Sequence, residues 1–220
     1  WDSDEVLNLD AMPRRMAVVG GGVIGCEYAC VFAALGVQVQ LVHDRQEILS
    51  FLDRDICAVL QARMGALGVT FILGDRVTGC DSTQRGIKLR LSEKELRVDA
   101  VLVAAGREGN VHGLNLEAAG IRAGEGGIIS VNENFQTEQP HIYAAGDVIG
   151  LPALASTSME QARMAMVHAF DLGYKRSVAS VLPLAIYTIP EVAMAGETEK
   201  TLLAKGVEYV VGRSYYDRNA

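Results

Sequence analysis

The N-terminal half of the chain alternates between short apolar runs and longer segments with helical spacing. We expect buried strands at 16–19, 38–43 and 69–73, with helices at 23–35 and 53–67 between them. A short run that is apolar at successive positions is typical of a strand covered on both faces of a parallel sheet. Strands that alternate with helices predict an α/β fold built from βαβ units.

The pattern then changes to strict alternation of apolar and polar positions. Short strands are expected at 77–82, 87–91 and 96–98, joined by polar turns. This spacing predicts an antiparallel meander inserted into the α/β fold. A buried strand at 101–105 follows and closes the first part of the chain.

The rest of the chain is richer in loops. A helix is expected at 156–172, with Glu160 as its capping-box partner, and another near 197–205. Four further apolar runs predict strands at 128–131, 142–145, 186–189 and 207–211.

Gly20, Gly22 and Gly25 give the G-x-G-x-x-G spacing between the first strand and the first helix. The first glycine permits a tight turn, the second lets a pyrophosphate approach the backbone, and the third lets helix and strand pack closely. The helix N-terminus offers free N–H groups and a positive dipole end to the phosphates. The alternative is a tight turn without a ligand. The flanking strands and helix favour a dinucleotide site.

The second expected strand ends on His43, Asp44 and Arg45. An acid at this point accepts a hydrogen bond from the ribose 2′-hydroxyl of NAD, whereas an arginine suits the 2′-phosphate of NADP. Because both stand side by side here, we expect the site to accept both nucleotides. An ordinary solvated turn is the alternative for each residue taken alone.

Composition narrows the classes of function. The formal net charge of −7 argues against a nucleic-acid partner, and the sequence has no apolar run of about 18 residues that would span a membrane. We expect a cytoplasmic location. Cys26 and Cys30 lie one helical turn apart, which allows a metal or redox pair, but small buried residues suit this spacing better. Because the chain starts at Trp1, we expect it to be cut from a longer protein.

Two similar short sequences stand at the ends of expected strands. Ala-Ala-Gly-Arg ends at Arg107, and Ala-Ala-Gly-Asp ends at Asp147. Together with the glycine loop and the segment 137–147 (T-x5-Y-A-A-G-D), they resemble the flavoprotein disulfide-reductase family, which includes glutathione reductase and dihydrolipoyl dehydrogenase. The resemblance implies an NAD(P)-binding domain over 1–110, the C-terminal part of an FAD-binding domain over 111–180, and the start of an α+β interface domain over 181–220. It also implies a homo-oligomer.

The resemblance further implies roles for individual residues. Glu27 would lie near the nicotinamide carboxamide and pair with a lysine that this chain lacks, and Asp147 would accept a hydrogen bond from the flavin ribitol. The nicotinamide nucleotide would contact Gly20, Gly22, Val23, Ile24, Gly25, Gly106 and Arg107, and the flavin would contact Gly146, Leu154 and Ala155. No catalytic residue and no metal site is expected within this chain.

Phrases such as G-D-V-I-G-L-P-A-L-A-S at 146–156 and I-Y-T-I-P-E at 186–191 resemble the members that transfer a hydride between NADPH and NAD through FAD. Two alternatives stay open. One is a disulfide reductase, which would need a redox cysteine pair. The other is a dinucleotide-binding sensor of redox state without catalysis.

Overall fold

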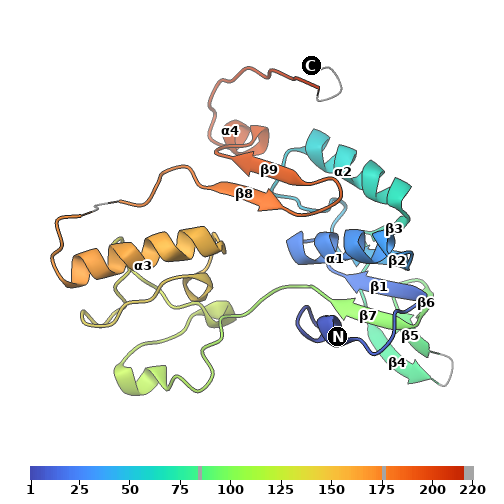
Figure 1. Ribbon diagram of the computed structural model, residues 1–220, viewed down its shortest axis with the longest axis horizontal. Helices are drawn as coiled ribbons and strands as arrows, with labels where there is room; N and C mark the ends of the chain where they lie inside the picture. Colours follow the sequence, from blue (N-terminus) through green and yellow to red (C-terminus); the bar gives the residue numbers. More distant parts are fainter. Residues whose placement is uncertain (84–85, 175–176, 216–220) are drawn as a thin grey trace. The chain divides into compact units, whose positions relative to one another are not determined.

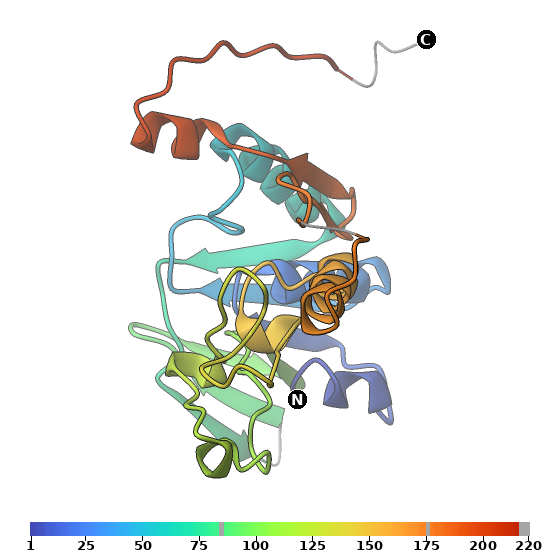
Figure 2. The same ribbon diagram turned by 90° about the vertical axis from the view of Figure 1, so that its left-hand side faces the viewer.

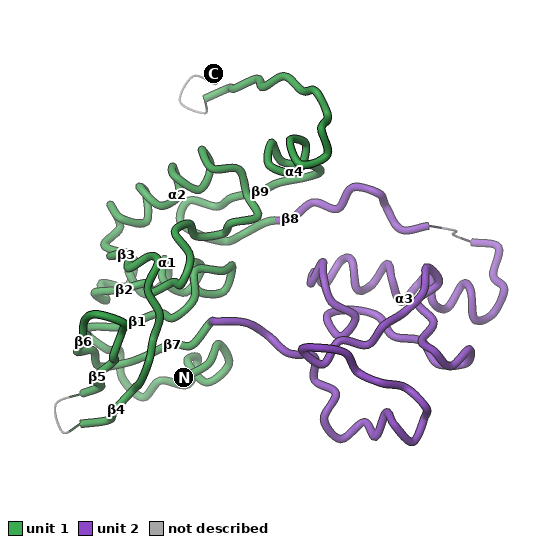
Figure 3. The backbone as a smooth tube through the Cα atoms, turned by 180° about the vertical axis from the view of Figure 1, so that it is seen from behind, with its two compact units in different colours: residues 1–104, 185–220 green, residues 105–184 purple. Residues whose placement is uncertain are grey.

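The computed structural model describes residues 1–83, 86–174 and 177–215 (Figure 1). It divides into two compact units (Figure 3). The first comprises residues 1–104 with the described part of 185–220, and the second comprises residues 105–184.

The first unit is an α/β domain, as the alternating pattern predicts. Its parallel sheet has the order β3-β2-β1-β7. The elements are the 3-10 helix η1 (Glu5–Asn8), β1 (Arg15–Val19), α1 (Val23–Ala34), β2 (Gln38–His43), α2 (Arg54–Leu67), β3 (Val69–Leu73) and β7 (Ala100–Val103). The chain moves outward from β1 to β2 and β3, and then returns to the other side of β1 with β7. The order therefore reverses at β1, and ligands of open α/β sheets bind at such a switch point.

The sheet has a helical face and a meander face because successive side chains of a strand point in opposite directions. The meander consists of β4 (Gly79–Thr83), β5 (Gly86–Arg90) and β6 (Glu95–Val98), paired antiparallel. Its buried side chains share one core cluster with alternate residues of the parallel sheet: Ala17, Val42, Ile72, Leu89, Leu91, Leu96, Val98 and Val101. The intervening Met16, Val18 and Leu41 are fully buried on the opposite face. The helices α1 and α2 pack against the sheet there.

The helix α2 begins and ends where the sequence indicates. Asp53 precedes the first residue of α2 in an extended conformation, and Gly68 ends that helix with φ +116°. Glycine adopts this left-handed conformation without the steric cost that a Cβ imposes, and it is the commonest helix terminator for that reason.

The C-terminal segment contributes a two-stranded sheet of β8 (Pro183–Ile186) and β9 (Val192–Ala195), followed by α4 (Glu199–Ala204). The expected strand at 186–189 is misplaced, because β8 ends at Ile186 and the next residues pass to a cis Ile189–Pro190 bond. The strand β9 was not expected from the sequence. The strand expected at 207–211 is wrong, since those residues form no ladder. Val210 there is 97% exposed, so the apolar run buries little surface.

In its described residues, the second unit contains α3 (Ala155–Ala169), three short 3-10 turns and loops. The turns are η2 (Leu116–Ala119), η3 (Glu125–Gly127) and η4 (Asp147–Ile149). The strands expected at 128–131 and 142–145 are wrong. Each run meets a partner at one isolated bridge, Ala123 with Ile129 and Gln136 with Tyr143, and a strand needs a partner along its length.

The capping box expected at α3 is also wrong. The helix begins one residue earlier than Ser156, and its N-cap is Leu154, whose side chain offers no acceptor. Glu160 instead forms an ion pair with Arg163 on the same helix.

Candidate functional site

The glycine loop after β1 has the geometry that its spacing predicts. Gly20 has φ +118°, and its N–H donates to the carbonyl of Val42 at 2.8 Å. A Cβ added to Gly25 would lie 2.0 Å from the carbonyl oxygen of Gly20, so only glycine lets α1 start this close to the turn. A Cβ added to Gly22 would meet no atom within 4 Å. The loop is therefore closed at Gly25 and open at Gly22.

The open side of the loop coincides with the start of α1. Gly22 is the N-cap of the helix, and no side chain caps the first turn. Val23 and Ile24, which follow it, are half-buried. The first N–H groups of a helix lack intrahelical partners and carry its positive dipole end. Bare backbone, open space and free donors together fit the diphosphate of a dinucleotide.

Gly21 has a role that sequence reasoning missed. Its added Cβ would lie 2.6 Å from Cδ2 of His43, so the imidazole ring packs directly on this residue. Its position as the middle of three consecutive glycines was the available signal. Burial lowers the pKa of His43, which keeps the ring neutral at pH 7, and its Nδ1 lies 3.2 Å from Oδ1 of Asp44. The end of β2 is thus fixed against the glycine loop.

Arg45 and Asp44 both reach solvent beside this turn. Arg45 Nη1 donates to Ser50 Oγ at 3.1 Å, and the side chain of Asp44 is 68% exposed. The structure therefore brings the glycine loop and the residues at the end of β2 together, with an acid and a cation available to a ribose.

Glu27 lies in the second turn of α1. Its Oε1 accepts a hydrogen bond from the backbone N–H of Tyr187 at 2.8 Å. The sequence resemblance implied a lysine partner outside this chain. In the structure a main-chain donor from the C-terminal segment contacts the carboxylate.

The other predicted site residues belong to the second unit. Gly106 and Arg107 are exposed, and Gly106 has φ +151°. Gly146 has φ +86°, and its N–H donates to the buried Oε1 of Gln161 at 2.7 Å. Gln161 was not predicted from the sequence, because a glutamine within a helix gives no signal of its target.

Asp147 and the residues at the start of α3 belong to different elements of this unit. Asp147 is exposed at the first position of η4. Leu154 is the N-cap of α3 and Ala155 its first residue, with Ser158 Oγ donating to the Leu154 carbonyl at 3.0 Å. No side chain caps this helix, so its first N–H groups are open to an acceptor.

The cysteines near the glycine loop are packing residues. Cys26, Cys30 and Cys57 are buried free thiols. Burial raises the pKa of Cys26 to about 12, and its Sγ donates to the carbonyl of Gly21 at 3.6 Å. A protonated buried thiol is a poor nucleophile and a poor metal ligand. Within the described ranges, no group of three His, Cys, Asp or Glu side chains is placed to hold a metal ion.

The amino-acid sequence is similar to those of known proteins over nearly the whole chain. The chain is 44% identical to the soluble pyridine nucleotide transhydrogenase of Mycobacterium bovis, over 98% of this chain and 46% of that protein. It is 40% identical to the protein of the same name from Marinomonas, over 99% of this chain and 47% of that protein. The chain thus spans about half the length of the curated relatives it matches.

Two solved structures are also similar to this one in fold. The HOCl-induced flavoprotein disulfide reductase RclA of Escherichia coli matches with a TM-score of 0.88 and 30% identity, covering 94% of this chain and 48% of that one. LpdA of Mycobacterium tuberculosis matches with a TM-score of 0.86 and 31% identity, covering 94% and 45%. These neighbours confirm the predicted α/β fold with a Rossmann-like parallel sheet.

Among the helices that the structure describes, none is long and apolar enough to cross a membrane.

The family model for pyridine nucleotide-disulphide oxidoreductases matches residues 1–166. This match extends over well more than half of the chain and includes both the glycine loop and the turn at Asp147. The chain therefore belongs to the pyridine nucleotide-disulphide oxidoreductase family.

Proposed function

We propose that this chain forms the nicotinamide-nucleotide site and part of the flavin site of an enzyme that transfers a hydride between NADPH and NAD. The observation that carries the proposal is the glycine loop at the switch point of the sheet, closed at Gly25 and open at Gly22. The relatives named soluble pyridine nucleotide transhydrogenase, at 40–44% identity, support the reaction.

In this proposal the backbone holds the nucleotide. Gly22 leaves room for the diphosphate, and the N-terminal turn of α1 donates to it. Glu27 orients the carboxamide end of the nicotinamide. The remaining nicotinamide-site residues are Gly20, Val23, Ile24, Gly25, Gly106 and Arg107. Hydride transfer needs no acid or base from the protein at the moving atom, so positioning is the main contribution of these residues.

The second unit would hold part of FAD. Asp147 is exposed and would accept a hydrogen bond from a ribitol hydroxyl, while the bond from the Gly146 N–H to Gln161 holds the turn. The uncapped start of α3 at Leu154 and Ala155 favours negative charge nearby. The chemistry that bound FAD supplies is storage of a hydride between two nicotinamide nucleotides.

The wider organisation is part of the same proposal. We assign residues 1–110 to the NAD(P)-binding domain, 111–180 to the FAD-binding domain and 181–220 to the start of an interface domain through which the protein forms a homo-oligomer. The location is cytoplasmic, where both nicotinamide pools are available. The similarity to relatives named soluble pyridine nucleotide transhydrogenase supports these assignments.

A stopped-flow experiment on the whole protein in which this sequence occurs tests the reaction. NADPH should bleach the flavin absorbance, and NAD added afterwards should restore it without any disulfide. If restoration requires a disulfide such as lipoamide, the protein is instead a disulfide reductase, like the structurally similar flavoprotein disulfide reductase RclA. If NADPH binds without bleaching the flavin, a redox sensor is the better description.

Arg45→Ala should weaken NADPH binding about tenfold or more while changing NADH binding less than threefold. The reason is that a guanidinium forms charge-assisted hydrogen bonds with a 2′-phosphate, which NADH lacks. Titration calorimetry with each nucleotide measures the two affinities, and Arg90→Ala is the control because its guanidinium pairs with Asp81 in the meander. Equal losses for both nucleotides would show that Arg45 does not read the phosphate.

A further inference from the structure

The segment 44–53 joins β2 to α2 and carries Arg45 near its start. Its middle is held against the glycine loop by Leu49, whose N–H donates to the carbonyl of Gly21 at 2.8 Å. Leu49 is buried and has φ +46°, a conformation that a non-glycine residue adopts only when its surroundings enforce it. One side of the segment is therefore fixed by the nucleotide site itself.

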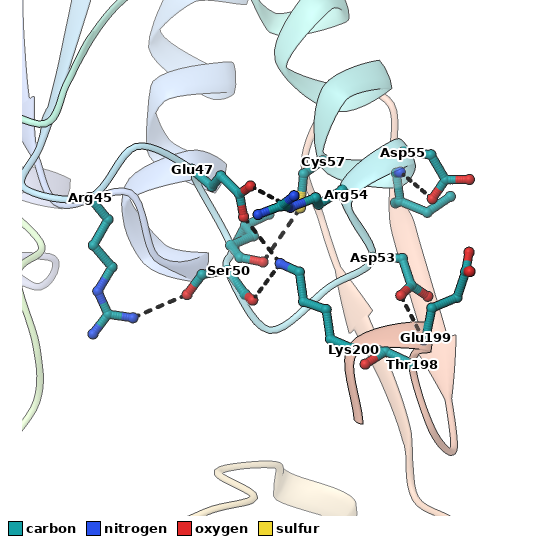
Figure 4. A network of polar contacts seen from close by, with 12 residues as sticks. Arg45, Glu47, Ser50, Asp53, Arg54, Asp55, Cys57, Thr198, Glu199 and Lys200 are labelled. Atoms are coloured by element: carbon teal, nitrogen blue, oxygen red, sulfur yellow. Dashed lines mark hydrogen bonds and ion pairs between the residues drawn. The ribbon is translucent and has the colours of Figure 1, made fainter. Parts of the chain in front are cut away.

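The other side of the segment is held by Lys200, which lies 150 positions beyond Ser50 in the sequence. Its Nζ donates to the Ser50 carbonyl at 3.1 Å and to Oε2 of Glu47 at 3.1 Å (Figure 4). The second oxygen of Glu47 pairs with Arg54 Nε at 2.8 Å. Lys200 and Arg54 together lower the pKa of Glu47, so this carboxylate remains charged at neutral pH.

Lys200 is itself fixed in place by the start of α4. Thr198 and Thr201 form a reciprocal capping box, which defines the first turn of this short helix. The N–H of Glu199 donates to Oδ1 of Asp53 at 2.8 Å, so the same turn is also tied to the beginning of α2. These contacts hold the turn that carries Lys200, and its side chain extends toward the segment 44–53 (Figure 4).

Ser50 connects Lys200 to Arg45. Its carbonyl accepts from Lys200, and its hydroxyl accepts from Arg45 Nη1 at 3.1 Å. A guanidinium carries five N–H donors, so a single bond to Ser50 orients the group and leaves the other donors for an anion. A shift of the Ser50 backbone would therefore move the guanidinium.

We propose that Lys200 is a positioning residue for recognition of the 2′-phosphate, acting through Ser50 on Arg45. This inference rests on the proposed function of Arg45. In it, discrimination between NADP(H) and NAD(H) depends on the C-terminal segment as well as on the turn after β2. The two elements meet only in the folded chain.

Direct attraction between Lys200 and the phosphate is not required. The side chains of Lys200 and Glu47 are each about a third exposed, and ion pairs at such positions contribute little stability because water screens them. A displacement of the guanidinium, by contrast, costs binding directly, because bidentate contacts with a phosphate depend on geometry. The expected effect is therefore selective for the phosphate rather than a general loss of folding.

The test compares two probes that differ by one phosphate, adenosine 2′,5′-bisphosphate and 5′-AMP, by titration calorimetry on the full chain. Lys200→Met should lower the affinity for the bisphosphate about fivefold and change the affinity for 5′-AMP by less than about twofold. Lys200→Arg should restore most of the difference, since it keeps a donor of similar length. Lys205→Met is the matched control, because Lys205 follows the C-terminal end of α4 and its side chain pairs with Glu197.

A double-mutant cycle supplies the readout that a structural role would not move. If Lys200 acts through Arg45, Lys200→Met should cost nothing further in the Arg45→Ala background. Equal weakening of both probes, or unchanged binding of both, would overturn the inference. If Lys200→Met does not fold, Lys200→Gln and Ser50→Ala decide the matter by the same ratio of affinities.

Failure of this inference is distinguishable from failure of the proposed function. If Arg45→Ala lowers bisphosphate affinity and Lys200→Met does not, Arg45 keeps its role and Lys200 loses the one proposed. If Arg45→Ala leaves the ratio of the two probes unchanged, the phosphate-reading role of Arg45 falls, and the inference about Lys200 falls with it.

Discussion

Gly25→Ala should destabilise the first unit by about 3 kcal/mol or more, the upper range for overpacking in a closed site. The new Cβ would lie 2.0 Å from the carbonyl oxygen of Gly20 and 3.0 Å from its carbonyl carbon. Both are backbone atoms at the start of the loop, so β1 and α1 would have to separate. Thermal unfolding followed by circular dichroism measures the loss, with an expected fall in Tm of about 6–12 °C.

Gly65→Ala in α2 is the matched control. It makes the same chemical change inside a helix, at a position where a Cβ meets no atom within 4 Å. Alanine is favoured over glycine in a helix interior by about 0.5–1 kcal/mol, so this variant should be slightly more stable than the parent chain. If both variants had the same Tm, the close approach between Gly25 and Gly20 would not be a determinant of the fold.

Gly22→Ser should leave the stability of the fold unchanged and lower the affinity for both nicotinamide nucleotides by about tenfold to a hundredfold. Serine is at least as good an N-cap as glycine, and its Cβ has open space in the folded chain. The side chain would occupy the position proposed for the diphosphate, and its hydroxyl would compete for the first N–H groups of α1. The loss of a few hydrogen bonds to a charged diphosphate accounts for an effect of this size.

Calorimetric titration with NADH and NADPH measures this effect. Because the diphosphate is common to the two nucleotides, their affinities should fall by the same factor, unlike the selective loss expected for Arg45→Ala. Unchanged affinity for NADH would show that the diphosphate does not lie against Gly22. Together, Gly25→Ala and Gly22→Ser separate the folding role of the glycine loop from its binding role.

Local sequence was sufficient to predict the elements of the parallel sheet. The run at 16–19 is apolar at successive positions because both faces of that strand are covered, and the helix at 53–67 ends on a glycine that adopts a left-handed conformation. The same reasoning failed at 128–131, 142–145 and 207–211. An apolar run shows that a segment can form a strand, but pairing depends on a partner that the run itself does not specify.

What the sequence by itself determined is the glycine spacing, the residues at the end of β2, and therefore the class of ligand and the family. Only the tertiary structure decided that His43 packs on Gly21, that Tyr187 contacts Glu27, and that Lys200 supports Ser50. The physical reason is sequence separation. Motifs such as the glycine loop act through backbone geometry within a few residues, whereas these contacts join residues that 22 to 160 positions separate, and only the packing of the sheet and the C-terminal segment brings them together.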